Sequence, residues 1–398
     1  MNNNKLLISA AGSGKTTYIV NKALELDKTQ RVLITTYTIE NEAEIKNIIL
    51  KKSKTIPSNV TIQGWFSFLL QHGVRPFQGS MNDMLFDREI KGMLLSEGDS
   101  SIRRDSSGKP IIYNGRPLSW GEKDFERFYF TSGWKIYSDK VSKFIVECNT
   151  GTNGAIIDRL SRIYSHIFID EVQDLAGFDL EIIWLLFKSD IVTTLVGDPR
   201  QVTYKTNHYR KYTKYKNGKI KEFVENELGK NIQCEIDEKT LKRSHRNNKQ
   251  ICEYSSKLYP EFEKTEPCKC EKCRRCVTIH EGVFLVKNND VGEYMKIYKP
   301  MQLIWSKSTK VNPDYPVLTF GSSKGKTFER VIIYPTPNIK RWIKDNNFDF
   351  MEVKNEKRKQ IKDVKEKFYV AITRAKRSVA IIYNYSDSEE IDGAKKWK

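Results

Sequence analysis

The sequence predicts an α/β protein built from two parallel sheets that are covered by helices on both faces. Short β-branched runs alternate with helical patterns up to about residue 205, and a similar alternation returns after about residue 235. Strands separated by helices usually become parallel neighbours, which favours this class over an all-β or all-helical fold. Apolar residues make up 39% of the chain, which is enough to build packed cores.

The first α/β core takes its elements from two stretches of the chain. Strands are expected at residues 6–10, 31–37, 60–63, 166–172 and 191–198, and helices at 15–26, 40–51 and 180–188. The pattern stops between about residues 76 and 161, where polar segments containing Gly and Ser occur. We therefore predict a first domain of residues 1–75 and 160–205, interrupted by a mostly helical insertion at 76–159.

The second core lies in the C-terminal half. Strands are expected at residues 302–305, 317–320, 331–334 and 379–383, a charged helix at 351–366 and a more apolar helix at 367–376. We predict that residues 206–246 form the linker and the start of the second domain. Residues 247–298 are expected to be a short Cys-rich insertion, and residues 299–398 the main part of that domain.

The charge of the chain favours a polyanionic partner. Lys and Arg total 68 against 50 Asp and Glu, a formal net charge of +18. Phosphates neutralised by such cations release counterions, although a generically basic protein fits the charge equally well. No run approaches the roughly 20 apolar residues that span a bilayer, and the polar start at residues 1–5 does not resemble a signal peptide. We therefore expect a cytoplasmic protein.

A phosphate-binding loop follows the first predicted strand and opens the first predicted helix. It reads Ser-Ala-Ala-Gly-Ser-Gly-Lys-Thr over residues 9–16, with Ser9 in place of the first Gly of the P-loop pattern. The two glycines let backbone N–H groups curl around the β-phosphate, Lys15 reaches the β and γ oxygens, and the Thr16 hydroxyl binds Mg²⁺. The predicted nucleotide-binding residues are Ala11, Gly12, Ser13, Gly14, Lys15, Thr16 and Thr17.

An apolar strand farther along the chain ends in two carboxylates. Residues 167–169 are Ile-Phe-Ile, and Asp170 and Glu171 follow directly. In P-loop NTPases this arrangement puts the first carboxylate on Mg²⁺ and the second beside the attacking water. Asp170 is therefore a predicted Mg²⁺ ligand, and Glu171 is the predicted general base for ATP hydrolysis.

With the next three residues this second motif reads Asp-Glu-Val-Gln-Asp, and here the sequence resembles the UvrD/Rep-like helicases of superfamily 1. Residues 196–201, 241–247, 319–328 and 369–375 resemble the third to sixth motifs of that family, in its order. The matching blocks extend from residue 6 to residue 383. The resemblance implies two RecA-like domains that close on ATP and Mg²⁺ and drive movement along single-stranded DNA, with 3′-to-5′ polarity.

The resemblance also implies roles for individual residues. Gln201 would sense the γ-phosphate, and Arg246 and Arg374 would place cations on it. Residues 36–38 and 61–68 lie where the family has its strand-contacting motifs. The residues expected to contact DNA are Tyr37, Thr38, Trp65, Tyr204, Thr319 and Lys324.

The sequence departs from the family in three places. Fourteen residues precede Lys15, which leaves no room for the family's adenine-reading glutamine motif, so strict preference for ATP is not implied. Lys326 and Thr327 stand where the family usually has Leu-Glu, so its ribose contact is not implied either. Only the 72 residues 247–318 separate Arg246 of the fourth motif from Thr319 of the fifth, so the large subdomain that the family inserts there is absent or minimal.

The segment 204–221 interleaves cationic side chains with four tyrosines. Cationic grooves with aromatic platforms hold single-stranded nucleic acids, so this segment is a candidate DNA track. A solvated linker between the two cores is an equally good interpretation.

Four of the seven cysteines lie within nine residues: Cys268, Cys270, Cys273 and Cys276. In a reducing compartment such a cluster is more often a metal site than a pair of disulfides, and four thiolates complete a tetrahedral Zn²⁺ shell. His280 is an alternative ligand, and an iron–sulfur cluster or a metal-free loop stays open. For His245 we expect a packing or stacking role. Because the nucleotide motifs lie outside the Cys segment, we expect the ATP site to survive loss of the metal.

The leading interpretation of function is a DNA-dependent ATPase that translocates on single-stranded DNA and unwinds duplex. A translocase that strips proteins from DNA is one alternative. A DNA-sensing switch that recruits a nuclease or another repair or defence protein is a second alternative, from a different class.

Overall fold

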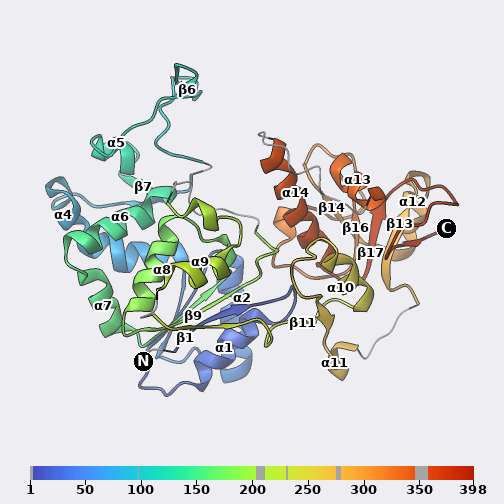
Figure 1. The fold of residues 1–398 in the computed structure, drawn as a ribbon, viewed down its shortest axis with the longest axis horizontal. Coiled ribbons are helices and arrows are strands. Elements are labelled where there is room, and N and C mark those ends of the chain that lie inside the picture. Colours follow the sequence, from blue (N-terminus) through green and yellow to red (C-terminus); the bar gives the residue numbers. More distant parts are fainter. Residues whose placement is uncertain (1–2, 97, 203–210, 230–231, 275–278, 346–356) are drawn as a thin grey trace. The chain divides into compact units, whose positions relative to one another are not determined.

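The computed structural model describes residues 3–96, 98–202, 211–229, 232–274, 279–345 and 357–398. The chain divides into two compact units, each with its own six-stranded sheet (Figure 1). The first unit comprises residues 1–7, 16–197 and 204–237. The second comprises residues 8–15, 198–203 and 238–398, so it includes most of the P-loop.

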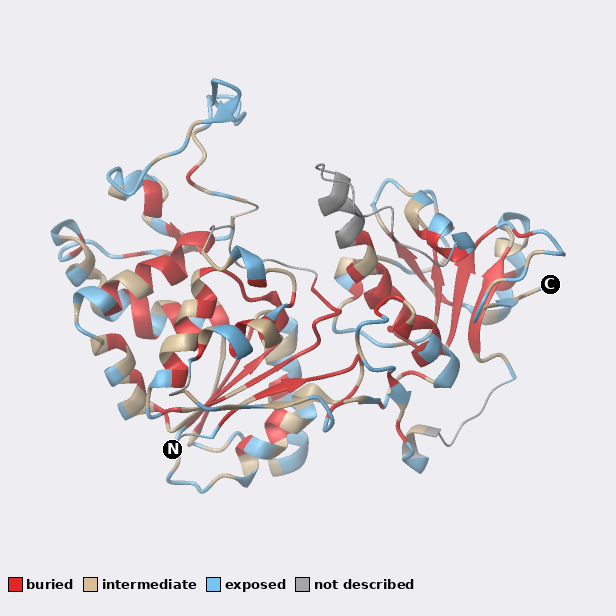
Figure 2. Ribbon diagram, viewed as in Figure 1, coloured by how far each residue is buried: buried red, intermediate tan, exposed pale blue. Residues whose placement is uncertain are grey.

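The sheet of the first unit has the strand order β10-β1-β9-β8-β2-β3. Its strands are β1 (Asn4–Ile8), β2 (Val32–Thr36), β3 (Val60–Gly64), β8 (His166–Asp170), β9 (Val192–Gly197) and β10 (Cys234–Asp237). β2 runs parallel to β3 and β8, β8 to β9, and β1 to β10. All of β2 is buried, as expected for a central strand covered on both faces (Figure 2).

Five helices accompany the strands of the first sheet, and three of them, α1, α2 and α8, lie where the sequence predicts helices. They are α1 (Lys15–Glu25), α2 (Ile39–Ser53), α3 (Trp65–Leu69), α8 (Phe178–Lys188) and α9 (Ile220–Glu227). The Thr38 hydroxyl caps the start of α2 by accepting a hydrogen bond from the N–H of Asn41, at 3.2 Å. Lys54 caps its end with a left-handed backbone, and its N–H donates to the carbonyl oxygen of Leu50.

The insertion of the first unit is helical at its two ends. Its helices are α4 (Gln78–Met81), α5 (Phe125–Tyr129), α6 (Ser138–Gly151) and α7 (Ala155–Ile163). Between them lie two small two-stranded sheets: β4 (Gly92–Leu94) with β7 (Lys135–Tyr137), and β5 (Ile112–Tyr113) with β6 (Arg116–Pro117). The exposed β5–β6 hairpin projects away from the rest of this unit (Figure 1).

The sheet of the second unit has the order β15-β14-β16-β17-β13-β18. Its strands are β13 (Gly282–Val286), β14 (Met301–Ile304), β15 (Val317–Thr319), β16 (Phe328–Ile333), β17 (Ala375–Ile382) and β18 (Lys395–Lys396), and the five neighbouring pairs are parallel. Its longer helices are α10 (Lys249–Ser256), α12 (Val291–Tyr298), α13 (Pro337–Asp345) and α14 (Lys357–Ile372).

Side chains that alternate along the strands fill two cores on opposite faces of this second sheet. In β16, Val331 and Ile333 join the larger core, which α10, α13 and α14 complete, whereas Ile332 joins the smaller core under α12. Period-two alternation between two covered faces is the pattern of a doubly wound α/β domain. The two parallel sheets confirm the predicted fold class.

Three boundaries differ from the sequence prediction. β13 and α10 belong to the second core, although both lie inside the predicted Cys-rich insertion at 247–298. β10 pairs with β1 of the first sheet, so residues 206–246 are not simply a linker and the start of the second domain. The predicted break between helices at residue 366 is also wrong, because α14 continues to Ile372 and β17 begins at Ala375.

Among the residues that the structure describes, none of the helices is both long enough and apolar enough to cross a lipid bilayer.

Candidate nucleotide-binding site

The P-loop curves between β1 and α1 because two of its residues adopt left-handed backbone conformations. These are Gly12, with φ +71°, and Gly14, with φ +83°. A Cβ atom on Gly12 would lie 2.7 Å from the Cβ of Arg246 and 2.9 Å from the Oγ of Ser244. Both the backbone angle and this close approach therefore require glycine at position 12.

Ser13 offers an unsatisfied donor at the same loop. Its side chain is buried, and its hydroxyl makes no hydrogen bond to the part of the chain that the structure describes. A buried hydroxyl without a partner is costly, and a phosphate oxygen would satisfy it. The loop therefore fits the nucleotide that its sequence predicts.

The segment that carries Arg246 is held between the P-loop and the turn from α14 to β17, all within the second unit. The N–H of His245 donates a hydrogen bond to the carbonyl oxygen of Gly12, at 2.8 Å. Arg246 Nη1 and Asn247 Nδ2 both donate to the carbonyl oxygen of Thr373, at 3.2 and 3.1 Å. The predicted arginine finger is thus adjacent to the phosphate-binding loop.

The second predicted cation, Arg374, contacts the predicted γ-phosphate sensor. Its side chain is buried, and its Nη2 donates to Gln201 Oε1 at 2.9 Å. The Gln201 amide in turn donates to Asp198 Oδ2 at 2.7 Å. Two residues that lie 173 positions apart in the sequence therefore form one polar network in the second unit.

Arg200 is a member of this network that sequence reasoning missed. Its Nε donates to Asp198 Oδ1 at 2.7 Å, its Nη2 to the carbonyl oxygen of Ser9 at 2.8 Å, and its Nη1 to Thr265 Oγ1 at 3.2 Å. Burial lowers the pKa of this guanidinium, but Asp198, together with Tyr369 and Tyr259, more than offsets that effect, so the net pKa is raised. Arg200 therefore stays charged and links the first residue of the P-loop, Ser9, to Thr265, which is far away in the sequence.

Two groups suited to Mg²⁺ lie together in the first unit. Thr16 Oγ1 donates to Asp170 Oδ2 at 3.4 Å, where Asp170 ends β8. Glu171 follows with a left-handed backbone, φ +58°, and its carboxylate accepts a hydrogen bond from the side-chain amide of Gln173. Hydroxyl and carboxylate oxygens are the ligands that Mg²⁺ prefers, so Thr16 and Asp170 fit the metal that their motifs imply.

The residues predicted to contact DNA have different surroundings. Tyr37 is half-buried and forms a T-shaped pair with Phe66, with ring centroids 5.6 Å apart, and the Thr38 hydroxyl caps α2. In the second unit, Thr319 accepts a hydrogen bond from the N–H of Ser322, and Lys324 follows that turn. For these residues the DNA contact stays a prediction, and Tyr204 lies outside the described residues.

One of the residues predicted to contact DNA, Trp65, is buried in the structure. Only 1% of this residue is exposed, and its indole N–H donates to Asp179 Oδ1 at 3.0 Å. A base could stack on the ring only if Trp65 left the core of the first unit. Trp65 is therefore a core residue, and the prediction that it contacts DNA is wrong for this conformation.

In the described part of the cationic segment, residues 211–221, two lysines pair with acidic side chains of the first unit. Lys211 lies 2.9 Å from Glu181 of α8, and Lys214 lies 2.8 Å from Glu227 of α9. Tyr215 is buried and donates to Glu227 at 2.6 Å. These pairs favour the interpretation of this part as a connecting segment that packs on the first unit.

The cysteine cluster has a histidine partner, but not the one considered from the sequence. Cys268, Cys270 and Cys273 converge with His245, whereas Cys276 lies outside the described residues. His280 stacks between the rings of Phe284 and Tyr298 and bonds Tyr294 through its Nε2. Burial and the neighbouring Arg330 lower the pKa of His280 to about 4. The expected packing role thus belongs to His280, and His245 is the metal-ligand candidate.

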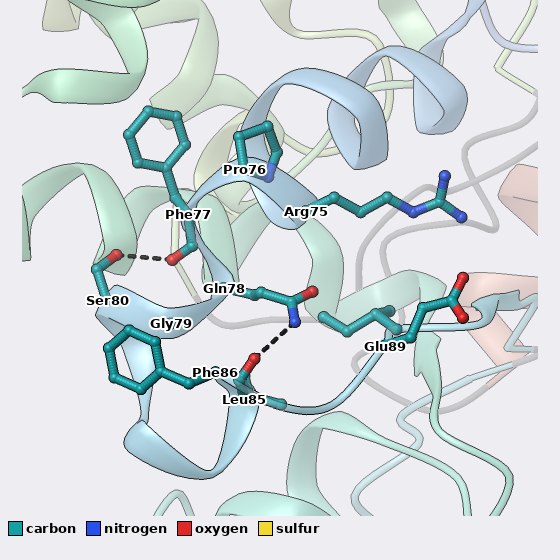
Figure 3. Close-up of a pocket in the computed structure, with 10 residues that line it drawn as sticks. Arg75, Pro76, Phe77, Gln78, Gly79, Ser80, Leu85, Phe86 and Glu89 are labelled. Carbon is teal, nitrogen blue, oxygen red and sulfur yellow. Dashed lines mark hydrogen bonds between the residues drawn. The ribbon is translucent and has the colours of Figure 1, made fainter.

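A separate pocket of about 470 Å³ lies in the first unit around α4 (Figure 3). Arg75, Phe77, Phe86 and Glu89 are among the residues that line it. The Gln78 amide donates to the carbonyl oxygen of Leu85 at 2.7 Å, so this polar group stabilises the loop instead of facing a ligand. None of the predicted site residues lines this pocket.

Comparison with known proteins agrees with the motifs. The AAA domain family matches residues 1–207, which is more than half of the chain. The chain belongs to the AAA domain family. This membership and the helicase motifs in order confirm the recognition of a UvrD/Rep-like protein of superfamily 1.

Individual relatives are similar over part of their length. The ATP-dependent DNA helicase Rep of Buchnera aphidicola subsp. Schizaphis graminum is 26% identical over 230 residues, which cover 50% of this chain and 35% of that protein. The arterivirus nonstructural protein 10 helicase in complex with DNA has a TM-score of 0.43 at 14% identity, covering 97% of this chain and 62% of that one. The PRRSV helicase has a TM-score of 0.41 at 13% identity, covering 97% and 53%. The chain thus spans 35% of the length of its curated relative.

Proposed function

We propose that this AAA domain protein hydrolyses ATP to move along single-stranded DNA and to unwind duplex, with 3′-to-5′ polarity. The observation that carries the proposal is the contact of the Arg246 segment with the P-loop, beside the buried Arg374–Gln201 pair. Phosphoryl transfer is catalysed mainly by positioning and by neutralising charge, and these residues supply both.

Each site residue then has one task in hydrolysis. The P-loop amides and Lys15 bind the phosphates, and Thr16 and Asp170 would hold Mg²⁺, which neutralises phosphate charge when bound. Glu171 takes the proton of the attacking water, while Arg246 and Arg374 stabilise the charge that develops on the γ-phosphate. ATP-driven closure of the two RecA-like domains, which the resemblance implies, is part of this proposal.

The test is ATP turnover with single-stranded DNA, double-stranded DNA or RNA, in wild type and in Lys15→Ala. We expect strong stimulation by single-stranded DNA, and loss of turnover in the variant. Lys22→Ala is the matched control, because Lys22 lies on the same helix but pairs with Glu25 in solvent. Equal turnover with and without nucleic acid would refute a DNA-driven motor.

Strand displacement then separates unwinding from translocation alone. Duplexes with a 3′ tail should be opened, and duplexes with a 5′ tail should not. Nucleotide binding without DNA-stimulated turnover would instead favour the DNA-sensing switch. DNA-stimulated turnover without strand displacement would favour a translocase that strips proteins from DNA.

A further inference from the structure

Four soft ligand atoms converge at one place in the second unit. They are Nδ1 or Nε2 of His245 and the Sγ atoms of Cys268, Cys270 and Cys273, all within 4.8 Å of one another. We call these four residues the thiol–imidazole cluster. The described cysteines form no disulfide, so these sulfurs meet as thiols.

The spacing within the cluster suits a tetrahedral metal site. Cys270 Sγ lies 3.2 Å from Cys268 Sγ and 2.8 Å from Cys273 Sγ, and His245 Nδ1 lies 3.7 Å from the sulfurs of both Cys270 and Cys273. Zinc bonds of their usual lengths imply tetrahedron edges of about 3.8 Å between sulfurs and about 3.6 Å from sulfur to nitrogen. The imidazole is already at this distance, and the sulfurs need to separate by only about an ångström.

The backbone brings the two parts of the cluster together. β11 (Arg243–Ser244) runs parallel to β12 (Glu266–Pro267), and the N–H of Cys268 donates to the carbonyl oxygen of Ser244 at 2.8 Å. The short helix α11 (Glu271–Arg274) then presents Cys273 beside Cys270. The site is thus assembled by tertiary structure from two separate segments.

The same short strand connects the cluster to the P-loop. The N–H of His245 donates to the carbonyl oxygen of Gly12 at 2.8 Å, and a Cβ on Gly14 would meet its ring carbon Cδ2 at 3.8 Å. The next residue, Arg246, fills the space beside Gly12. His245 is therefore both a member of the thiol–imidazole cluster and a neighbour of the phosphate-binding loop.

We propose that the thiol–imidazole cluster binds one Zn²⁺, and that this metal strengthens nucleotide binding by fixing His245 against the P-loop. Three thiolates with one imidazole are a typical closed shell for structural zinc. A metal that restrains His245 also restrains the backbone of Gly12, to which the His245 N–H donates, so the loop is pre-organised for phosphate. This replaces the expectation from the sequence that the ATP site is independent of the metal.

Metal content tests the ligand set. Purified wild type should contain about one zinc per chain by elemental analysis. His245→Ala and Cys273→Ser should lose it, whereas Cys234→Ser, outside the cluster, and Cys276→Ser should keep it. His245→Cys should also keep the metal, because it replaces one ligand with another. Circular dichroism and thermal unfolding check that each variant is folded.

Cobalt substitution gives a readout that does not depend on activity. Cobalt-loaded wild type should show the intense visible absorption of a tetrahedral site, and His245→Cys should shift that spectrum as a nitrogen is replaced by sulfur. A spectrum unchanged by this substitution would remove His245 from the shell and overturn the proposal.

The coupling to nucleotide is measured in wild type before and after removal of the metal with a zinc-selective chelator, followed by desalting and excess Mg²⁺. The affinity for a non-hydrolysable ATP analogue should fall at least about fivefold in the zinc-free protein, and Zn²⁺ affinity should rise by the same factor when the analogue is bound. The coupling rests on nucleotide binding from the proposed function, whereas metal content does not.

The outcomes are distinguishable. A wild type that binds zinc but no nucleotide would refute the proposed function and this coupling. Nucleotide binding that is indifferent to zinc would overturn the coupling alone. Protein purified without chelators that holds no zinc, holds iron instead, or carries a disulfide between Cys270 and Cys273 would overturn the zinc site itself.

Discussion

Replacing Arg200 by Met should destabilise the second unit strongly. Asp198 is fully buried and Arg200 almost so, and their side chains form an ion pair at 2.7 Å. Met keeps much of the side-chain volume but leaves the carboxylate without its cation. Breaking a buried pair from one side typically costs about 3–5 kcal/mol. For a domain of this size, that loss corresponds to a fall in Tm of roughly 6–20 °C.

The matched control is an ion pair in solvent. Lys376 and Glu329 lie 2.7 Å apart, with side chains 49% and 60% exposed, so Lys376→Met should cost less than about 1 kcal/mol. Denaturant unfolding, followed by circular dichroism, measures both. The double variant Asp198→Asn, Arg200→Met should be more stable than Arg200→Met alone, because no charge is left buried without a partner. An Arg200→Met variant within about 1 kcal/mol of wild type would refute this reasoning.

Three further predictions concern residues that the sequence singled out. Arg246→Ala and Arg374→Ala should bind ATP nearly as wild type yet lose about 10³-fold or more in turnover, and normal hydrolysis by either would exclude its role as a γ-phosphate cation. Trp65→Ala should lose about 3–5 kcal/mol of stability without weakening DNA binding by the folded protein, whereas Tyr37→Ala should weaken single-stranded DNA binding by about 1–3 kcal/mol in a filter or fluorescence assay. The pKa of His280 in the folded protein is lowered to about 4, so as the pH falls this imidazole is protonated in the unfolded chain before it is protonated in the folded one. Tm should therefore fall as the pH drops from about 6.5 towards 4. His280→Gln should make Tm depend less on pH over this range.

The sequence predicted those strands and helices that a local pattern of apolar residues marks. Most strands of both sheets appear at or within a few residues of their expected positions, because a buried parallel strand is a short apolar run. β13 was missed although it reads Gly-Val-Phe-Leu-Val, because it follows the cysteines so closely that its segment was assigned by composition. β10 was missed because its four residues contain two acids, and only pairing with β1 identifies it as a strand.

In the candidate site too, the sequence predicted local motifs but not contacts between distant segments. Motif spacing identified the P-loop, the two carboxylates and both arginines, since each is a contiguous block. Arg200 and His245 were not recognised, because their roles depend on contacts with Ser9, Thr265 and the cysteines, far away in the sequence. The prediction that Trp65 contacts DNA failed for a related reason. A motif identifies an aromatic residue in the sequence but does not show whether its ring faces solvent or the core.

The way the chain is threaded has a practical consequence for dissecting this protein. It passes from one compact unit to the other at residues 7/8, 15/16, 197/198, 203/204 and 237/238. A fragment of residues 238–398 would therefore lack Ala11 from its core and both Arg200 and Gln201 from its polar network. A fragment ending at residue 237 would keep the P-loop sequence but lose the Arg246 segment that packs on it. No single cut yields two complete halves, so the ATP site is best studied by point substitution in the whole chain.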